Sequence, residues 1–87
     1  MAVVILSHPV ADFNHWKTVY DQDAERRSGA GLKEVTVGQD SNDPNMVYMI
    51  YETSNPGVLQ QMISDPNMAE AMKEAGVTGP PTVVILK

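Results

Sequence analysis

Two histidines and a few aromatic residues are the side chains of this chain best suited to chemistry. His8 ends the first apolar segment, and His15 lies seven residues later beside the single tryptophan, Trp16. An imidazole has an ordinary pKa of about 6.5, so it can take up or release a proton near neutral pH. We predict that His8 is a general base, because a side chain at a strand end can point into a cleft. A histidine bonded to the backbone is the structural alternative.

The two histidines do not form a metal-binding pattern. His8, Asp12 and His15 could supply three ligands, since a strand end and the start of the next helix lie close together. Asp12 is better explained as a helix cap, and no His-x-His or His-x-x-x-His spacing occurs. We therefore expect no metal and no other cofactor, and we expect His15 to face solvent near the cap. The absence of cysteine excludes disulfides and thiol catalysis.

Strands without polar alternation lie near both ends of the chain and position these residues. Ala2–Leu6 is entirely apolar, within a first strand that we expect to run from Ala2 to His8, and Thr82–Leu86 is the last strand. Strands of this kind are buried on both faces of a sheet. The helices between them suffice to cover only one face. We therefore predict that a second copy of the chain covers the other face.

The intervening sequence completes a βαββαβ order. Asp12 is expected to cap a helix over Phe13–Ser28, with a left-handed cap at Gly29. Strands Leu32–Gly38 and Met46–Thr53 read as a hairpin around a stretch of turn-forming residues. Two short helices follow, capped by Asn55 and Asp65 with Pro56 and Pro66 at their first positions, and Gly76 ends the second of these helices.

The hairpin register decides which side chains meet a ligand. If Val37 pairs with Val47 and Val35 with Met49, one face of the hairpin suits a helix-covered core. The other face mixes apolar and polar groups, as a ligand cavity does, and carries Glu34, Thr36, Tyr48, Ile50 and Glu52. In the alternative interpretation, the two glutamates are simply solvated near strand ends. A slip of one residue would exchange the two faces.

Length and charge bound the class of protein. The 87 residues are expected to form one domain, residues 1–87. A formal net charge of −5 makes nucleic acid and anionic membranes poor partners. No leader peptide and no apolar run of the ~20 residues that span a bilayer is recognised. A cytoplasmic location is the expectation.

Four segments carry a resemblance that covers nearly the whole chain: residues 8–17 (HPVADFNHWK), 43–47 (DPNMV), 64–68 (SDPNM) and 71–81 (AMKEAGVTGPP). They resemble small proteins of the dimeric α+β barrel superfamily, which also contains antibiotic biosynthesis monooxygenases and some polyketide cyclases. The resemblance implies an α+β, ferredoxin-like fold with a four-stranded antiparallel sheet. The sheets of two such chains would form a barrel, with ligands bound inside it or between sheet and helices.

The resemblance implies a homodimer that binds a small apolar or aromatic molecule. A cofactor-independent monooxygenase or cyclase is one hypothesis, with His8 as base and the Tyr48 hydroxyl as hydrogen-bond donor. The other candidate ligand contacts are Trp16, Tyr20, Glu34, Thr36, Ile50 and Tyr51, although Trp16 and Tyr20 share a helical face that usually means core. A non-catalytic binding protein and a dimeric structural module with a filled barrel are the alternatives. Haem degradation is disfavoured, because the region after the hairpin has no histidine.

Overall fold

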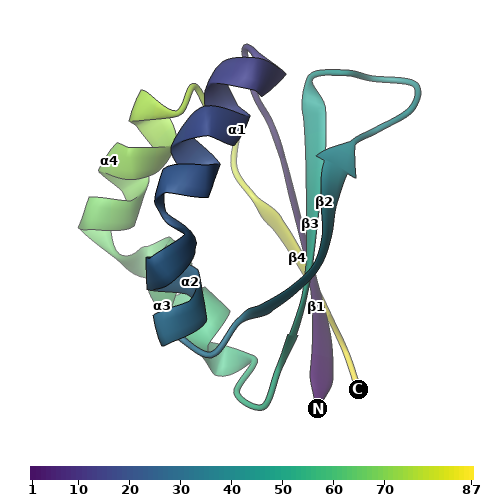
Figure 1. Ribbon diagram of the computed structural model, residues 1–87, viewed down its shortest axis with the longest axis vertical. Coiled ribbons are helices and arrows are strands. Elements are labelled where there is room, and N and C mark those ends of the chain that lie inside the picture. The colour runs from purple at the N-terminus through teal and green to yellow at the C-terminus, as the bar shows by residue number, and fades with distance from the viewer.

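The expected order of strands and helices is present in a computed structural model that describes residues 1–87 (Figure 1). Each predicted helical region contains two helices. The elements are β1 (Ala2–Pro9), α1 (Phe13–Gln22), α2 (Ala24–Gly29), β2 (Lys33–Gln39), β3 (Met46–Thr53), α3 (Gly57–Ser64), α4 (Pro66–Glu74) and β4 (Thr82–Leu86). None of the helices is long and apolar enough to cross a bilayer.

The four strands form one antiparallel sheet in the order β2-β3-β1-β4. All four helices lie on one side of this sheet, and the opposite side is uncovered (Figure 1). The predicted ferredoxin-like fold with a four-stranded antiparallel sheet is therefore confirmed. The edge strand β4 is mostly exposed within a single chain, because it pairs with only β1 and the helices cover little of it.

The strand registers assign side chains to the two faces. One row across the helix-covered face contains Val37, Met49, Leu6 and Val83, and the adjacent row contains Glu34, Tyr51, Val4 and Ile85. The central row of the uncovered face contains Thr36, Ile50, Ile5 and Val84. The rows on either side of it contain Tyr48, Ser7 and Thr82, and Glu52, Val3 and Leu86. The uncovered face is thus apolar along its centre.

The predicted hairpin register was wrong by two residues, and a bulge changes one face. Val37 pairs with Met49, and the register shifts between Glu34 and Thr36. Two residues of β2 therefore oppose one residue of β3, which reverses the alternation on the N-terminal side of the bulge. Glu34 consequently lies on the helix-covered face opposite Tyr51, and Val35 is 52% exposed. Both placements correct the predicted faces, whereas Thr36, Tyr48, Ile50 and Glu52 lie on the expected one.

The first helical region is not the single helix that was predicted. The backbone N–H of Asp23 bonds the carbonyl of Tyr20, three residues earlier, and α1 ends there. The left-handed residue after α2 is Gly31, with φ of 83°, rather than Gly29. Backbone N–H groups of Gly31 and Leu32 bond the carbonyls of Ser28 and Arg27, a pair of bonds that closes a helix C-terminus.

The later helices start and stop largely as their sequence predicts. Asp65 accepts a hydrogen bond from the N–H of Asn67, and Pro66 occupies the first position of α4. Gly76 adopts φ of 81° directly after α4, which confirms the predicted C-terminal signal. Asn55 does not cap α3 with its side chain, because that helix begins at Gly57 after Pro56 and has no side-chain cap bond.

Trp16 is the centre of the hydrophobic core. Its side chain is 3% exposed, and its ring stacks on Tyr20 with a centroid distance of 4.8 Å. The centres of the Phe13 and Trp16 rings lie 5.9 Å apart, and the His8 ring makes a T-shaped contact with Trp16 at 5.7 Å. The helical stripe that the sequence predicts is therefore a column of aromatic rings against the sheet.

We predict that Trp16→Ala lowers the free energy of unfolding by about 3 to 5 kcal/mol, because it leaves a large void beneath α1. Gln22→Ala is the matched control at an exposed position of the same helix and should cost about 0.5 kcal/mol or less. Urea denaturation followed by circular dichroism measures both. A loss below about 1 kcal/mol for Trp16→Ala would mean that the ring is not a core anchor.

Candidate functional site

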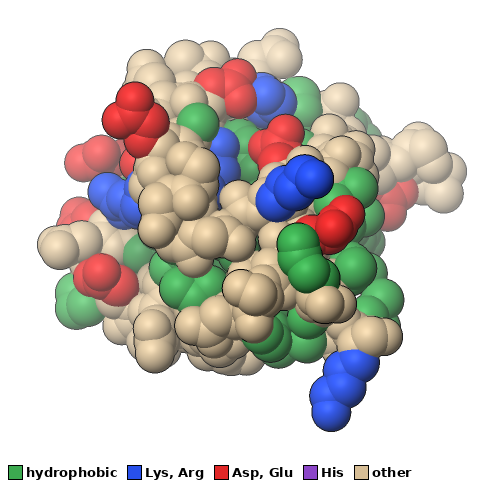
Figure 2. Space-filling view, turned by 60° about the horizontal axis from the view of Figure 1, so that its bottom comes forward, with side chains coloured by type: hydrophobic (Ala, Val, Ile, Leu, Met, Phe, Trp, Pro, Cys, Tyr) green, Lys and Arg blue, Asp and Glu red, His purple; other side chains and the backbone are tan.

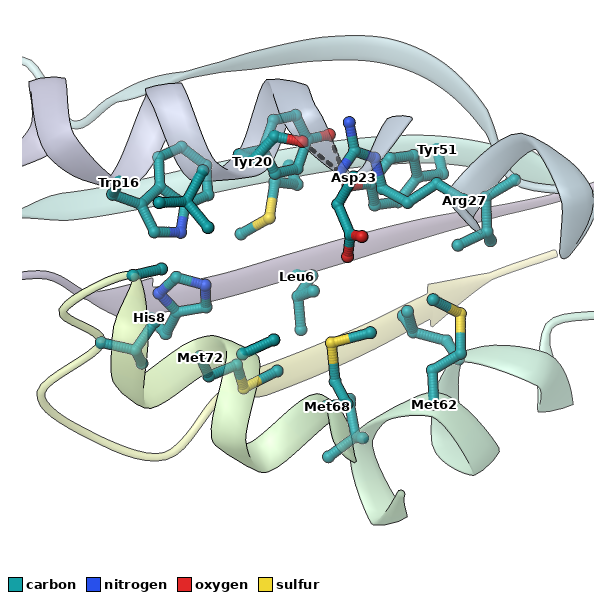
Figure 3. Close-up of a pocket in the computed structure, with 18 residues that line it drawn as sticks. Leu6, His8, Trp16, Tyr20, Asp23, Arg27, Tyr51, Met62, Met68 and Met72 are labelled. Atoms are coloured by element: carbon teal, nitrogen blue, oxygen red, sulfur yellow. Dashed lines mark hydrogen bonds between the residues drawn. The ribbon is translucent and has the colours of Figure 1, made fainter. Parts of the chain in front are cut away.

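A cavity of about 90 Å³ lies between the helix-covered face of the sheet and the four helices. Its lining is almost entirely apolar. Figure 3 shows His8 and Trp16 at one end, Tyr51 and Arg27 at the other, and three methionines along the facing wall. Those methionines, Met62, Met68 and Met72, come from α3 and α4. Because methionine side chains are unbranched and flexible, this wall can adapt to a guest.

His8 is a buried ionisable side chain in the lining of this cavity. It lies near the end of β1, is 3% exposed, and its Nδ1 is buried without a hydrogen-bond partner. Burial lowers the pKa of His8, and contacts with the backbone of His8 and Pro9 oppose that effect more weakly. The imidazole is therefore neutral at pH 7 and has a nitrogen lone pair with which to accept a proton.

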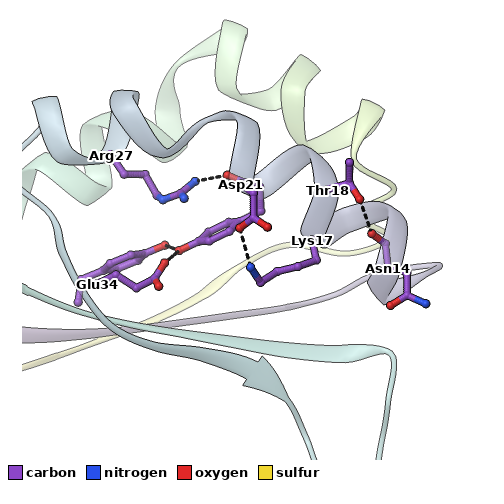
Figure 4. Close-up of polar contacts among 8 residues, drawn as sticks. Asn14, Lys17, Thr18, Asp21, Arg27 and Glu34 are labelled. Atoms are coloured by element: carbon purple, nitrogen blue, oxygen red, sulfur yellow. Dashed lines mark hydrogen bonds and ion pairs between the residues drawn. The ribbon is translucent and has the colours of Figure 1, made fainter.

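Two tyrosines and a glutamate form a hydrogen-bonded chain at the opposite end. The Tyr20 hydroxyl lies 2.8 Å from a Glu34 carboxylate oxygen and 2.6 Å from the Tyr51 hydroxyl (Figure 4). A carboxylate only accepts, so Tyr20 donates to Glu34 and Tyr51 donates to Tyr20. Burial raises the pKa of both phenols, and the Tyr51 hydrogen bond raises the pKa of Tyr20 further. Both tyrosines stay protonated at neutral pH and cannot serve as bases.

Arg27 covers the outer face of Tyr20. Its guanidinium carbon lies 3.4 Å from the centre of the Tyr20 ring, and its Nη1 donates to the Tyr20 carbonyl at 2.7 Å (Figure 4). The Tyr20 ring is thus held between Trp16 and a cation. Arg27 also lines a second, more polar groove that opens to solvent beside Glu34 and Tyr51. The apolar cavity therefore reaches the surface next to a positive charge.

The predicted site residues divide between the two faces of the sheet. His8, Trp16, Tyr20 and Tyr51 line the cavity, and Glu34 joins them through its hydrogen bond to Tyr20. Tyr48, Thr36 and Ile50 lie on the uncovered face, where Tyr48 is 39% exposed. Within one chain, His8 and Tyr48 therefore do not converge on the same molecule. Their catalytic roles stay predictions.

Sequence reasoning missed the part of the lining that tertiary structure brings together. Arg27 and Asp23 were not predicted as site residues, yet both line the cavity. Met62, Met68 and Met72 were likewise not predicted as site residues. A signal was present in the cluster Arg26, Arg27 and Lys33, the only local basic concentration in an acidic chain.

The remaining histidine lies outside the cavity. His15 is exposed, and its Nε2 lies 2.9 Å from the carbonyl of Glu74 at the end of α4. Asp12 accepts from the N–H of Asn14 and caps α1 as expected. His8, Asp12 and His15, considered above as three metal ligands, do not come together. No three His, Cys, Asp or Glu side chains form a group that could hold a metal ion.

Comparison with known proteins identifies the fold. No sequence profile of a known protein family matches the chain, and no curated protein matches it. Solved structures do match over nearly the whole chain. SnoaB, a cofactor-independent oxygenase from Streptomyces nogalater, is 11% identical with a TM-score of 0.69, and the match covers 99% of this chain and 90% of SnoaB.

Two further structures extend this comparison. A provisionally assigned antibiotic biosynthesis monooxygenase from Bordetella bronchiseptica is 17% identical with a TM-score of 0.72, covering 99% of this chain and 94% of its own. A conserved protein from Methanosarcina mazei is 16% identical with a TM-score of 0.70, covering 100% of this chain and 92% of its own. The chain therefore has the ferredoxin-like fold of proteins related to the antibiotic biosynthesis monooxygenases, as the sequence resemblance implied.

The buried state of His8 predicts a pH-dependent stability. Because the pKa of His8 is lower in the folded chain than the unfolded value of about 6.5, the unfolded chain binds more protons just below that pH. The contribution of neutral His8 to the free energy of unfolding is complete above pH 6.5 and is lost as the pH falls through the folded-state pKa. Each pKa unit between the folded and unfolded values of His8 corresponds to about 1.4 kcal/mol of unfolding free energy.

We expect the melting temperature of the wild type to fall between pH 7.5 and pH 5, and His8→Gln to reduce that fall. His15→Gln is the matched control and should keep the wild-type pH dependence, because it retains His8. Differential scanning calorimetry at a series of pH values measures all three proteins. An identical pH dependence for the wild type and His8→Gln would show that His8 does not resist protonation.

Proposed function

We propose that the protein binds a small, single-ring aromatic molecule in the cavity beside His8 and oxygenates it without a cofactor. The observation that carries the proposal is His8 itself: a neutral imidazole, with no hydrogen bond at Nδ1, in the wall of an apolar cavity. A buried polar atom without a partner is rare in proteins and calls for a functional explanation. A T-shaped contact with Trp16 holds the imidazole in place.

The chemistry fits an acidic phenol as substrate. His8 would accept the phenol proton, and the resulting electron-rich phenolate would react with O₂. One oxygen atom enters the ring as a new carbonyl and the other leaves as water, so that the phenol becomes a quinone. All electrons come from the substrate, which is why this reaction needs no external reductant. An apolar cavity disfavours a lone positive charge on His8. An acidic phenol meets this constraint, because its proton transfer forms the phenolate anion beside the protonated imidazole.

The size of the cavity limits the substrate. Sites for drug-sized molecules enclose roughly 300 to 1,000 Å³, and a cavity of ~150 Å³ is known to accept benzene. The observed volume of about 90 Å³ is smaller than either. A single ring would fit after the side chains of Met62, Met68 and Met72 rearrange, whereas a fused polycyclic substrate would require movement of the helices.

We also propose that the functional form is a homodimer in which two sheets face each other. The uncovered face exposes Tyr48 (39%), Val84 (44%) and Leu86 (48%), with Ile5 and Ile50 half-buried between them. Figure 2 shows hydrophobic side chains along the right-hand side of the molecule, on the side of this face. An apolar sheet face of this kind is expected to be covered by a partner. A cytoplasmic location stays the expectation from the sequence.

The role of His8 as base is tested by His8→Gln. Glutamine keeps polarity and approximate size but cannot accept a proton at neutral pH, so turnover of single-ring phenols should fall about 10²- to 10⁴-fold. Oxygen consumption and quinone absorbance measure turnover. We expect binding, followed by the fluorescence of Trp16, to change much less, because most of the cavity is apolar.

His15→Gln is the control for this experiment, since it removes the other, exposed histidine and should leave turnover unchanged. Equal activity in the wild type and His8→Gln would contradict the assignment of the base. Tight binding of phenols without oxygen consumption in the wild type would instead identify a non-catalytic binding protein.

The dimer is tested by placing a charge on the centre of the uncovered face. Sedimentation at micromolar concentration should give twice the chain mass of 9.5 kDa for the wild type and a single chain for Ile50→Lys, because a lysine there would be buried without a partner. Gln61→Lys, on the exposed side of α3, should stay dimeric. A wild-type monomer at these concentrations would remove the basis for the barrel.

A further inference from the structure

We infer that Arg27 is a binding residue for an anionic group of the ligand, so that the substrate is a single-ring aromatic acid. The acid group would lie where the cavity opens to solvent, at the end away from His8. This inference rests on the proposed function and adds the chemical class of the substrate to it.

The first observation is that Arg27 has no carboxylate partner. The ion pairs of the protein are Lys17–Asp21 and Arg26–Asp23, and Arg27 takes part in neither. A guanidinium has five N–H groups in a planar fork. One N–H group of Arg27 donates a hydrogen bond to the Tyr20 carbonyl. The other donors are free to bind a carboxylate, and two of them can do so side by side.

The second observation is that Arg27 is held in place before any ligand arrives. Its guanidinium carbon lies over the Tyr20 ring, 3.4 Å from the ring centre, and its Nη1 donates to the Tyr20 carbonyl. The arginine is half-buried, so water screens its charge less than that of a surface arginine. An anion that binds here therefore loses little free energy to ordering of the arginine side chain.

The third observation is the position of Arg27 at the junction of two surfaces. Arg27, Leu32 and Tyr51 line both the apolar cavity and the outer polar groove. A ligand with its ring in the cavity would present a substituent at this junction. Three carboxylates lie nearby. Asp23 pairs with Arg26, and Glu34 accepts a hydrogen bond from Tyr20. Glu25 lines the groove, where the positive charge of Lys33 offsets one negative charge. Arg27 is thus the cation left for a ligand.

Three probes of nearly equal size test the inference: benzoate, benzamide and benzylamine. The fluorescence of Trp16 reports binding directly, because it is the only tryptophan and lines the cavity. We expect the wild type to bind benzoate at least about tenfold more tightly than the other two, as charge-assisted hydrogen bonds predict. This preference should shrink when salt shortens the Debye length from ~30 Å to ~8 Å.

Substitutions of single residues test whether Arg27 causes the preference for benzoate. Arg27→Gln should remove it, and Arg27→Lys should keep only part of it, since lysine retains the charge but not the planar fork. Lys73→Gln removes an exposed cation of α4 that lies outside the cavity lining, so this control should retain the full preference. Melting curves confirm that each variant is folded, and the salt dependence of the wild type tests the inference without any variant.

The outcomes separate this inference from the function on which it rests. Equal affinity for the three probes, or equal weakening of all three by Arg27→Gln, would overturn the role of Arg27 while leaving the cavity as a binding site. If none of the probes changes the Trp16 fluorescence at millimolar concentration, the cavity does not bind single rings. In that case the proposed function and this inference both fail.

Discussion

The contact of Trp16 with the sheet is the interaction on which the rest of the structure depends. The buried indole stacks on Tyr20, so that α1 carries a column of rings on its buried face. Large, rigid rings leave space that small side chains do not fill, and the cavity lies beside them. His8 at one end and Arg27 at the other are both positioned by contact with this column.

The cavity combines groups of opposite character at its two ends. At the His8 end, desolvation keeps the imidazole neutral, which suits proton transfer from an acidic substrate. At the Arg27 end, the guanidinium lies near the surface and keeps its charge. A molecule that spans the cavity would therefore have a base at its inner end and a cation at the end that opens to solvent. The methionines of α3 and α4 provide an adaptable wall between these ends.

Much of the fold follows from local sequence, whereas the site follows from long-range contacts. The bounds of β3 and β4, the Asp65 cap and the Gly76 stop were predictable, because each depends on a few neighbouring residues. The bulge that turns Glu34 inward was not, since Glu34 bonds Tyr20, which is fourteen residues away and on another element. The stacking of Arg27 on Tyr20 joins α2 to α1, and no helix propensity predicts it.

The state of the His8 imidazole tests the account most directly, and long-range ¹H–¹⁵N NMR of the ring measures it. We expect the His8 nitrogens to report a neutral ring at pH 6.5 and to shift when phenol saturates the cavity, while the His15 signals stay in place. A His8 ring that is half-protonated at pH 6.5 and does not respond to phenol would contradict the claim that this buried base faces the ligand site.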